Sequence, residues 1–73
     1  MIGPRIEGYR TGERVQIADP SHPDNGAIGY ITGIMSTGAG AVFRVDIGAA
    51  RKSTHPIVRE LASTQLRPAK EKA

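Results

Sequence analysis

Alternating apolar and polar residues divide the chain into short strand patterns. In residues 13–18, Val15 and Ile17 would face one side of a sheet while their polar neighbours face the other. Residues 41–47 show the clearest alternation in the chain, with Phe43 on the apolar side. Both segments are therefore predicted to be strands with one face in the core and one face in solvent.

The pattern over residues 27–35 predicts a second strand that is bent. Its apolar residues do not keep one parity, since Ile31 and Ile34 lie three positions apart. Glycine inside a strand commonly marks a bulge. A bulge near Gly33 would let both isoleucines face the core, and a turn over residues 36–40 would join this strand to the third one as an antiparallel hairpin.

The segment over residues 55–62 fits two interpretations. Thr54 would cap a short helix whose apolar face includes Leu61. Alternatively, Ile57–Arg59 forms a fourth strand that is followed by one 3-10 turn. We favour the strand, because a sheet of three strands alone would leave its edges open. A short closing strand is then expected at residues 65–67.

Together these segments predict an all-β fold, a small closed or partly closed barrel of four to five antiparallel strands over residues 12–68. Seventy-three residues leave room for one domain. Residues 1–11 are predicted to be a flexible arm with Tyr9 as its first ordered anchor, and residues 69–73 a disordered tail. The expected core consists of Val15, Ile17, Ile28, Ile31, Ile34, Phe43, Val45, Ile47, Ile57, Leu61 and Leu66.

The glycine and β-branched positions resemble those of the SH3-like barrels, and within them the KOW type. The residues that carry the resemblance are Gly12, Val15 and Ile17, then Gly26, Gly29 and Ile31, with Ile34 after them. The resemblance covers residues 12–68 and implies an SH3-like fold. KOW segments of ribosomal proteins and elongation factors usually carry more Lys and Arg in the first loop, whereas residues 19–24 are net acidic here.

Composition narrows the classes of function. The net charge is +3, which permits contact with phosphate backbones or acidic proteins but falls short of a dense basic stripe. The chain has no cysteine, so thiolate metal sites and disulfides are excluded. The longest apolar run is too short to span a bilayer, and no secretory signal pattern is seen, so we expect a cytoplasmic protein without a membrane partner.

The basic residues suggest one binding surface. In a small barrel the third strand, the loop after it and the closing segments can bring their cations together to meet phosphates. Tyr30, on the second strand, is the candidate for stacking against a base. The leading hypothesis is weak nucleic-acid binding through backbone phosphates, and its basic members are Arg44, Arg51, Lys52, Arg59 and Arg67. The alternative is that these are scattered charges, partly paired with Asp46 and Glu60.

The Pro-rich and Asn-Gly-containing loop over residues 19–26 supports a second hypothesis, a protein-interaction or accessory subunit that docks through this loop. Its candidate partner-binding residues are Asp19, His22, Asp24 and Asn25.

We expect no catalytic residues, metal, cofactor or small-molecule substrate, because no arrangement of nucleophile and base is apparent. The two histidines, His22 and His55, are expected to be exposed loop residues rather than metal ligands. A barrel of this size lacks a deep cavity of its own, so an enzyme would require a shared pore in an oligomer. We therefore favour a monomeric binding module.

Overall fold

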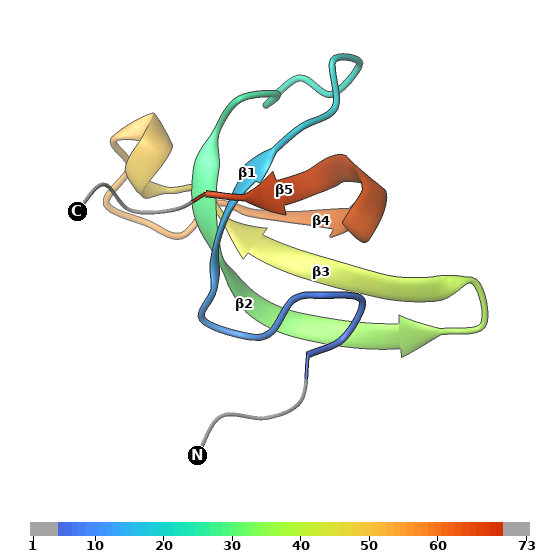
Figure 1. Cartoon of the computed structure of the whole chain (residues 1–73). Helices are drawn as coiled ribbons and strands as arrows, with labels where there is room; N and C mark the ends of the chain where they lie inside the picture. The colour runs from blue at the N-terminus through green and yellow to red at the C-terminus, as the bar shows by residue number, and fades with distance from the viewer. Residues whose placement is uncertain (1–4, 70–73) are drawn as a thin grey trace.

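The computed structural model describes residues 5–69, and these form an all-β fold, as predicted (Figure 1). The strands are β1 (Arg14–Ile17), β2 (Ile28–Thr37), β3 (Gly40–Asp46), β4 (Val58–Ala62) and β5 (Leu66–Pro68). Two short 3-10 helices complete the fold, η1 (Ala49–Arg51) and η2 (Ser63–Gln65). The first four residues of the predicted arm and residues 70–73 of the predicted tail lie outside the described residues.

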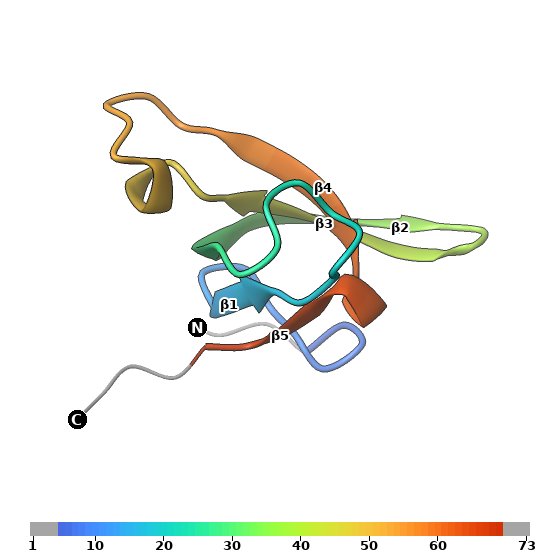
Figure 2. The ribbon, with the colours of Figure 1, turned by 90° about the horizontal axis from the view of Figure 1, so that it is seen from above.

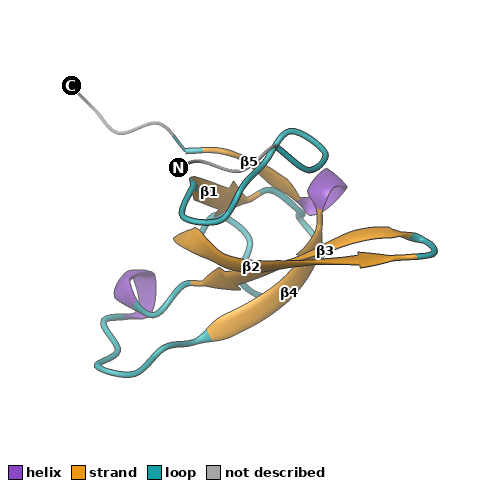
Figure 3. Cartoon of the chain, turned by 90° about the horizontal axis from the view of Figure 1, so that it is seen from below, coloured by secondary structure: helices purple, strands orange, loops and turns teal. Residues whose placement is uncertain are grey.

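The strands form one antiparallel sheet in the order β4-β3-β2-β1-β5. In a flat sheet of this order β4 and β5 would lie about 19 Å apart. Only the three residues of η2 join these two strands, and an extended link of that length reaches at most about 15 Å. The sheet must therefore curl until its two edges approach each other at η2, as the view from below shows (Figure 3).

The β2–β3 hairpin contains the predicted bulge. The register passes from Ile31 opposite Val45 to Gly33 opposite Arg44, so one residue of β2 is left without a partner on β3. As a result Ile31 is buried and Ile34 packs against the core. Beyond the bulge the hairpin projects past the other strands (Figure 2).

Residues 55–62 end in a strand, as we favoured, but its bounds were misplaced. Strand β4 begins at Val58 rather than Ile57 and continues to Ala62. The Ile57 amide donates a hydrogen bond to the Asp46 side chain, 3.2 Å away, and so lies outside the strand. The 3-10 turn that was expected after the strand is η2.

The core agrees with the prediction except at a few positions. Its buried members are Tyr9, Val15, Ile17, Ile31, Ala41, Phe43, Val45, Ile47, Leu61 and Leu66. Ile34 and Ile57 are partly buried against this cluster. Ile28 was predicted to be a core residue but is only half-buried, because it lies opposite Gln16 on the side of the sheet that carries Tyr30.

Residues 5–11 contact the sheet through Tyr9, which is buried as expected of an anchor. Its ring meets Phe43 edge-on, with centroids 5.5 Å apart and planes at 75°. The Glu7 carboxylate accepts hydrogen bonds from the Ser63 hydroxyl at 2.6 Å and from the Ala41 amide at 2.8 Å. These two donors lower the pKa of Glu7 and connect this segment to β3 and η2.

We predict that Gly29→Ala destabilises the fold. A Cβ at Gly29 would lie 2.3 Å from the Asp46 carbonyl oxygen, which is backbone and cannot turn aside. The expected loss in the free energy of unfolding is about 1–3 kcal/mol, as for other overpacked sites. Urea denaturation measures it. Gly38→Ala is the matched control, since a Cβ there meets nothing within 4 Å, and an equal loss in both variants would contradict the prediction.

Candidate functional site

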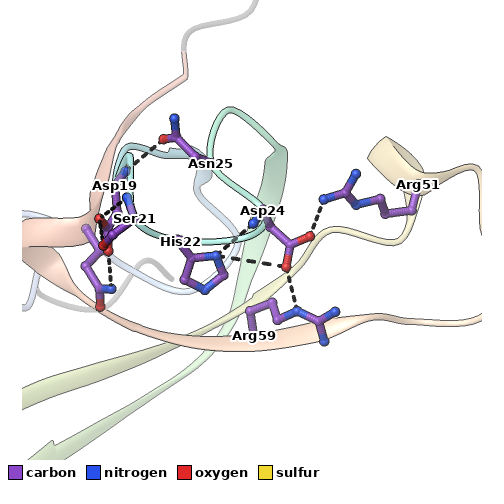
Figure 4. A network of polar contacts seen from close by, with 8 residues as sticks. Asp19, Ser21, His22, Asp24, Asn25, Arg51 and Arg59 are labelled. Carbon is purple, nitrogen blue, oxygen red and sulfur yellow. Dashed lines mark hydrogen bonds and ion pairs between the residues drawn. The ribbon is translucent and has the colours of Figure 1, made fainter.

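The loop between β1 and β2 is held in shape by its own polar groups (Figure 4). The Asp19 carboxylate accepts hydrogen bonds from the Ser21 amide at 3.0 Å and hydroxyl at 2.7 Å. It also accepts one from the Gln65 amide group at 2.8 Å, which connects the loop to η2. The Gln65 and Ser21 hydrogen bonds lower the pKa of Asp19. At the far end of the loop, the Asn25 side-chain oxygen accepts the Asp19 amide at 2.9 Å.

Asp24 is the buried charged residue of the described chain, with 7% of its surface exposed. One carboxylate oxygen accepts a hydrogen bond from Arg51 Nη2, and the other accepts one from Arg59 Nε at 2.8 Å. The two guanidinium groups, Arg59 first, hold the pKa of Asp24 below its ordinary value of 3.8. One carboxylate therefore joins the loop to η1 and β4, which are distant in sequence (Figure 4).

His22 supports this arrangement from within the loop. Its Nδ1 accepts a hydrogen bond from the Asp24 amide at 2.9 Å. The same nitrogen lies 4.0 Å from an Asp24 carboxylate oxygen. The His22 side chain is only 18% exposed, so the expectation that it is an exposed loop residue is wrong, whereas His55 is exposed.

An open groove of about 650 Å³ lies beside this cluster, between the loop, the first two strands and η1. Arg14 and Tyr30 occupy paired positions on β1 and β2 and line it, and Arg51 lines it from η1. Tyr30 is 47% exposed, a large fraction for an aromatic side chain. The groove therefore combines one exposed ring with two cations, and its remaining lining residues are Asn25, Gly26, Ala27, Ile28, Ala49 and Ala50.

A smaller groove of about 290 Å³ shares the Asn25-Gly26 turn with the first. Arg67 and Gln16, which are paired across β5 and β1, line it. Arg67 Nε donates to the Gln16 side-chain oxygen at 2.7 Å, and the Gln16 amide group donates to the Gly26 carbonyl at 2.9 Å. A chain of hydrogen bonds thus fixes Arg67 relative to the turn that separates the two grooves.

The predicted basic set is therefore only partly brought together. Tyr30 and Arg51 line the large groove, and Arg67 lines the small one. Arg59 is engaged with Asp24. Arg44 lies 3.4 Å from Glu60 across β3 and β4 and lines neither groove, which agrees with the paired-charge alternative for this residue.

Lys52 follows η1 directly, is exposed, and has left-handed backbone angles with φ of 53°. Arg14 is the charged lining residue that the sequence analysis did not select. The alternation with Val15 already placed it on the outer face of the first strand. The missing information was the register, because only the pairing of Arg14 with Tyr30 shows that the two side chains share a groove.

The four residues of the loop hypothesis all make contacts inside the protein. Asp19 contacts Ser21 and η2, His22 contacts the Asp24 amide, and Asp24 holds two arginines. The Asn25 side chain accepts a backbone amide. These contacts give each of the four a role in the shape of the loop.

We predict that Asp24→Asn lowers stability at neutral pH and makes stability less sensitive to acid. The folded pKa of Asp24 lies below its unfolded value of 3.8, so ionised Asp24 stabilises the fold above that pH. As the pH falls from about 5 through the lowered pKa, the unfolded state binds more protons and this contribution is lost. The pKa values of Asp19 and Glu7 are also lowered in the folded protein, so these two carboxylates make stability fall with acid as well. The Asp24→Asn variant should therefore keep part of the dependence of unfolding free energy on pH.

Urea unfolding at a series of pH values measures this dependence. Glu60→Gln is the control for the change in net charge, because the Glu60 side chain is 56% exposed. An Asp24→Asn protein with the acid sensitivity of the wild type would contradict the assignment of Asp24 as an ionised, doubly paired carboxylate.

Within residues 5–69, no group of three or more His, Cys, Asp or Glu side chains is placed to hold a metal ion. The same part of the chain contains no helix with the length and apolar character needed to cross a membrane. Comparison of the chain with protein-family models, with curated proteins and with solved structures finds no match. The geometry of the two grooves is therefore the basis for any functional conclusion.

Proposed function

We propose that this chain is a small, non-enzymatic module that binds nucleic acid through its phosphate backbone, at the groove beside Tyr30. The observation that carries the proposal is the grouping of an exposed aromatic ring with two arginines in one open groove. Arginine recognises phosphate through several N–H donors at once, and an exposed ring offers a surface on which a base can stack.

The ion pairs with Asp24 are compatible with this role. A guanidinium has five N–H donors, and Arg51 gives one nitrogen to Asp24. Its other nitrogens can donate to a phosphate while Asp24 holds the side chain in place. A side chain that is already ordered loses less conformational entropy on binding than a free one. The same reasoning applies to Arg67, which is fixed through its Nε by Gln16.

We infer that the curled sheet is an SH3-like barrel of the KOW type. The strand order, in which β5 returns to pair with β1, and the 3-10 turn between β4 and β5 support this inference. The positions of Gly29 and Gly33 fit it too, since each lies where the backbone approaches another strand or bulges. The resemblance to KOW segments also supports nucleic-acid binding. The net acidic first loop, however, departs from the KOW pattern.

A protein partner is the second candidate, favoured by the edge of β4. Among the strands of residues 5–69 this strand pairs with β3 alone, and its first three residues are exposed, including Val58 at 43%. An extended peptide can add to such an edge by main-chain hydrogen bonds. NMR titration with nucleic acid distinguishes the candidates, since shifts should cluster around Tyr30 and Arg51 in the first case and be absent in the second.

We predict that Arg51→Gln weakens binding to a labelled oligonucleotide by about twofold to fivefold, the range expected for one exposed charge contact. The slope of log affinity against log salt should fall by about 1, because one fewer counterion is released. Fluorescence anisotropy at several salt concentrations measures both quantities.

Arg44→Gln is the matched control for this experiment. It removes the same charge from a side chain of similar exposure, 50% against 46%, but its acid partner Glu60 is exposed whereas Asp24 is buried. Urea unfolding of both variants therefore accompanies the binding measurement, since loss of a partner of a buried carboxylate can destabilise the fold. Equal losses in the two variants would mean that only net charge matters and would contradict the assignment to the groove. Binding that does not change with salt would contradict the phosphate contact altogether.

A further inference from the structure

We infer that the preferred ligand is a single strand that crosses both grooves, with one base stacked on Tyr30 and phosphates near Arg51 and Arg67. This inference rests on the proposed function and specifies its substrate class. The observations behind it are the exposure of Tyr30, the turn shared by the two grooves, and the placement of arginines on both sides of that turn.

The exposed ring distinguishes a single strand from a duplex. In a duplex the bases are stacked on each other and their faces are unavailable, whereas the bases of a single strand can be stacked on a protein ring. Tyr30 is nearly half exposed and lies on the outer face of β2, opposite Arg14. A duplex could reach the arginines but would leave the ring without a function.

The arrangement of the strands determines the path that a bound single strand would follow across the protein. Arg67 on β5 pairs with Gln16 on β1, and Gln16 pairs with Ile28 on β2. Strands in a sheet lie about 4.8 Å apart, so Arg67 is displaced from the strand that carries Tyr30 by about 10 Å. Arg51 borders the groove from η1. Cations therefore lie at separate points around the ring, and an extended chain of several nucleotides can contact more than one of them.

The turn between the grooves is suited to a close approach by a ligand. Gly26 has φ of 93° and no side chain, and a Cβ at this position would meet no atom of residues 5–69 within 4 Å, so the described residues leave the space above it open. Asn25 is exposed, and its side-chain oxygen is used by the Asp19 amide. Its side-chain NH₂ group is therefore a donor that a phosphate or base crossing the turn can use.

The test uses the full chain and oligonucleotides of about ten nucleotides, within the about 4–16 that one OB-fold barrel covers. A deoxythymidine strand and its RNA counterpart are compared with a blunt duplex of equal length by fluorescence anisotropy at low salt. We expect either single strand to bind at least about tenfold more tightly than the duplex. The comparison of the DNA strand with the RNA strand shows which of the two single-stranded nucleic acids the protein prefers.

Intrinsic tyrosine fluorescence gives a second, independent measurement. The chain has no tryptophan and only two tyrosines, of which Tyr9 is buried in the core. Stacking of a base on Tyr30 should quench part of the signal, and Tyr9 provides an internal reference. In Tyr30→Phe the quenching should disappear while affinity is kept, because phenylalanine retains the ring. Tyr30→Ala should weaken single-strand binding by about 5- to 150-fold, the cost of one lost base stack.

The controls keep the two proposals separable. Met35→Ala removes another exposed apolar side chain, 38% exposed and outside both grooves, and should leave binding unchanged.

If the duplex binds as well as the single strand and Tyr30→Ala binds like the wild type, the single-strand inference is overturned but the phosphate-binding function stands. If neither nucleic acid binds at low salt, the proposed function itself is overturned. Should Tyr30→Ala not fold, the Tyr30→Phe quenching result alone decides the stacking claim.

Discussion

The arrangement of the segments around the large groove depends on the Asp24 carboxylate. It receives Arg51 from η1 and Arg59 from β4, and so fixes two segments against the loop that follows β1. A buried carboxylate is stable only when its charge is paired and its oxygens accept hydrogen bonds, and the two guanidinium groups meet both needs. Because the loop and η1 both line the large groove, the Asp24–Arg51 pair connects two of the segments that form it.

Two further carboxylates repeat this principle elsewhere in the molecule. Glu7 connects the N-terminal segment to β3 and η2, and Asp19 connects the loop to η2. In each case the acid accepts from at least one partner that is distant in the chain. A domain of this size buries only about 60% of the surface that its unfolded chain exposes, so its apolar core is small. Polar connections of this kind determine how the irregular segments lie on the sheet.

The sequence predicted the strands well because the information was local. The alternation of Val15 and Ile17, and of Phe43 with its neighbours, requires one buried face whatever the partner strand is. The bulge followed from Gly33 and the unequal parity of the isoleucines around it. Ile28 was misassigned because its apolar character suggested the core, while its register with Gln16 places it on the outer face.

The candidate site was less predictable because it depends on contacts between distant segments. Arg51 and Arg59 were selected for their charge, but nothing in the local sequence indicated that Asp24 would engage both. Arg14 was left out because the pairing of β1 with β2 is needed to bring it beside Tyr30. The proline and Asn-Gly content of the loop predicted turns, whereas its role as a wall of the grooves appears only in three dimensions.

The return of β5 to β1 also determines the order in which the chain can fold during synthesis. Strands β1 to β4 pair with their neighbours in sequence and can assemble step by step, but Gln16 must wait for Arg67, 51 residues later. Bringing such distant residues together costs more loop-closure entropy than forming a local hairpin. Until β5 leaves the ribosome, the edge of β1 that it will cover stays free, so the nascent chain is vulnerable to wrong pairing during that interval.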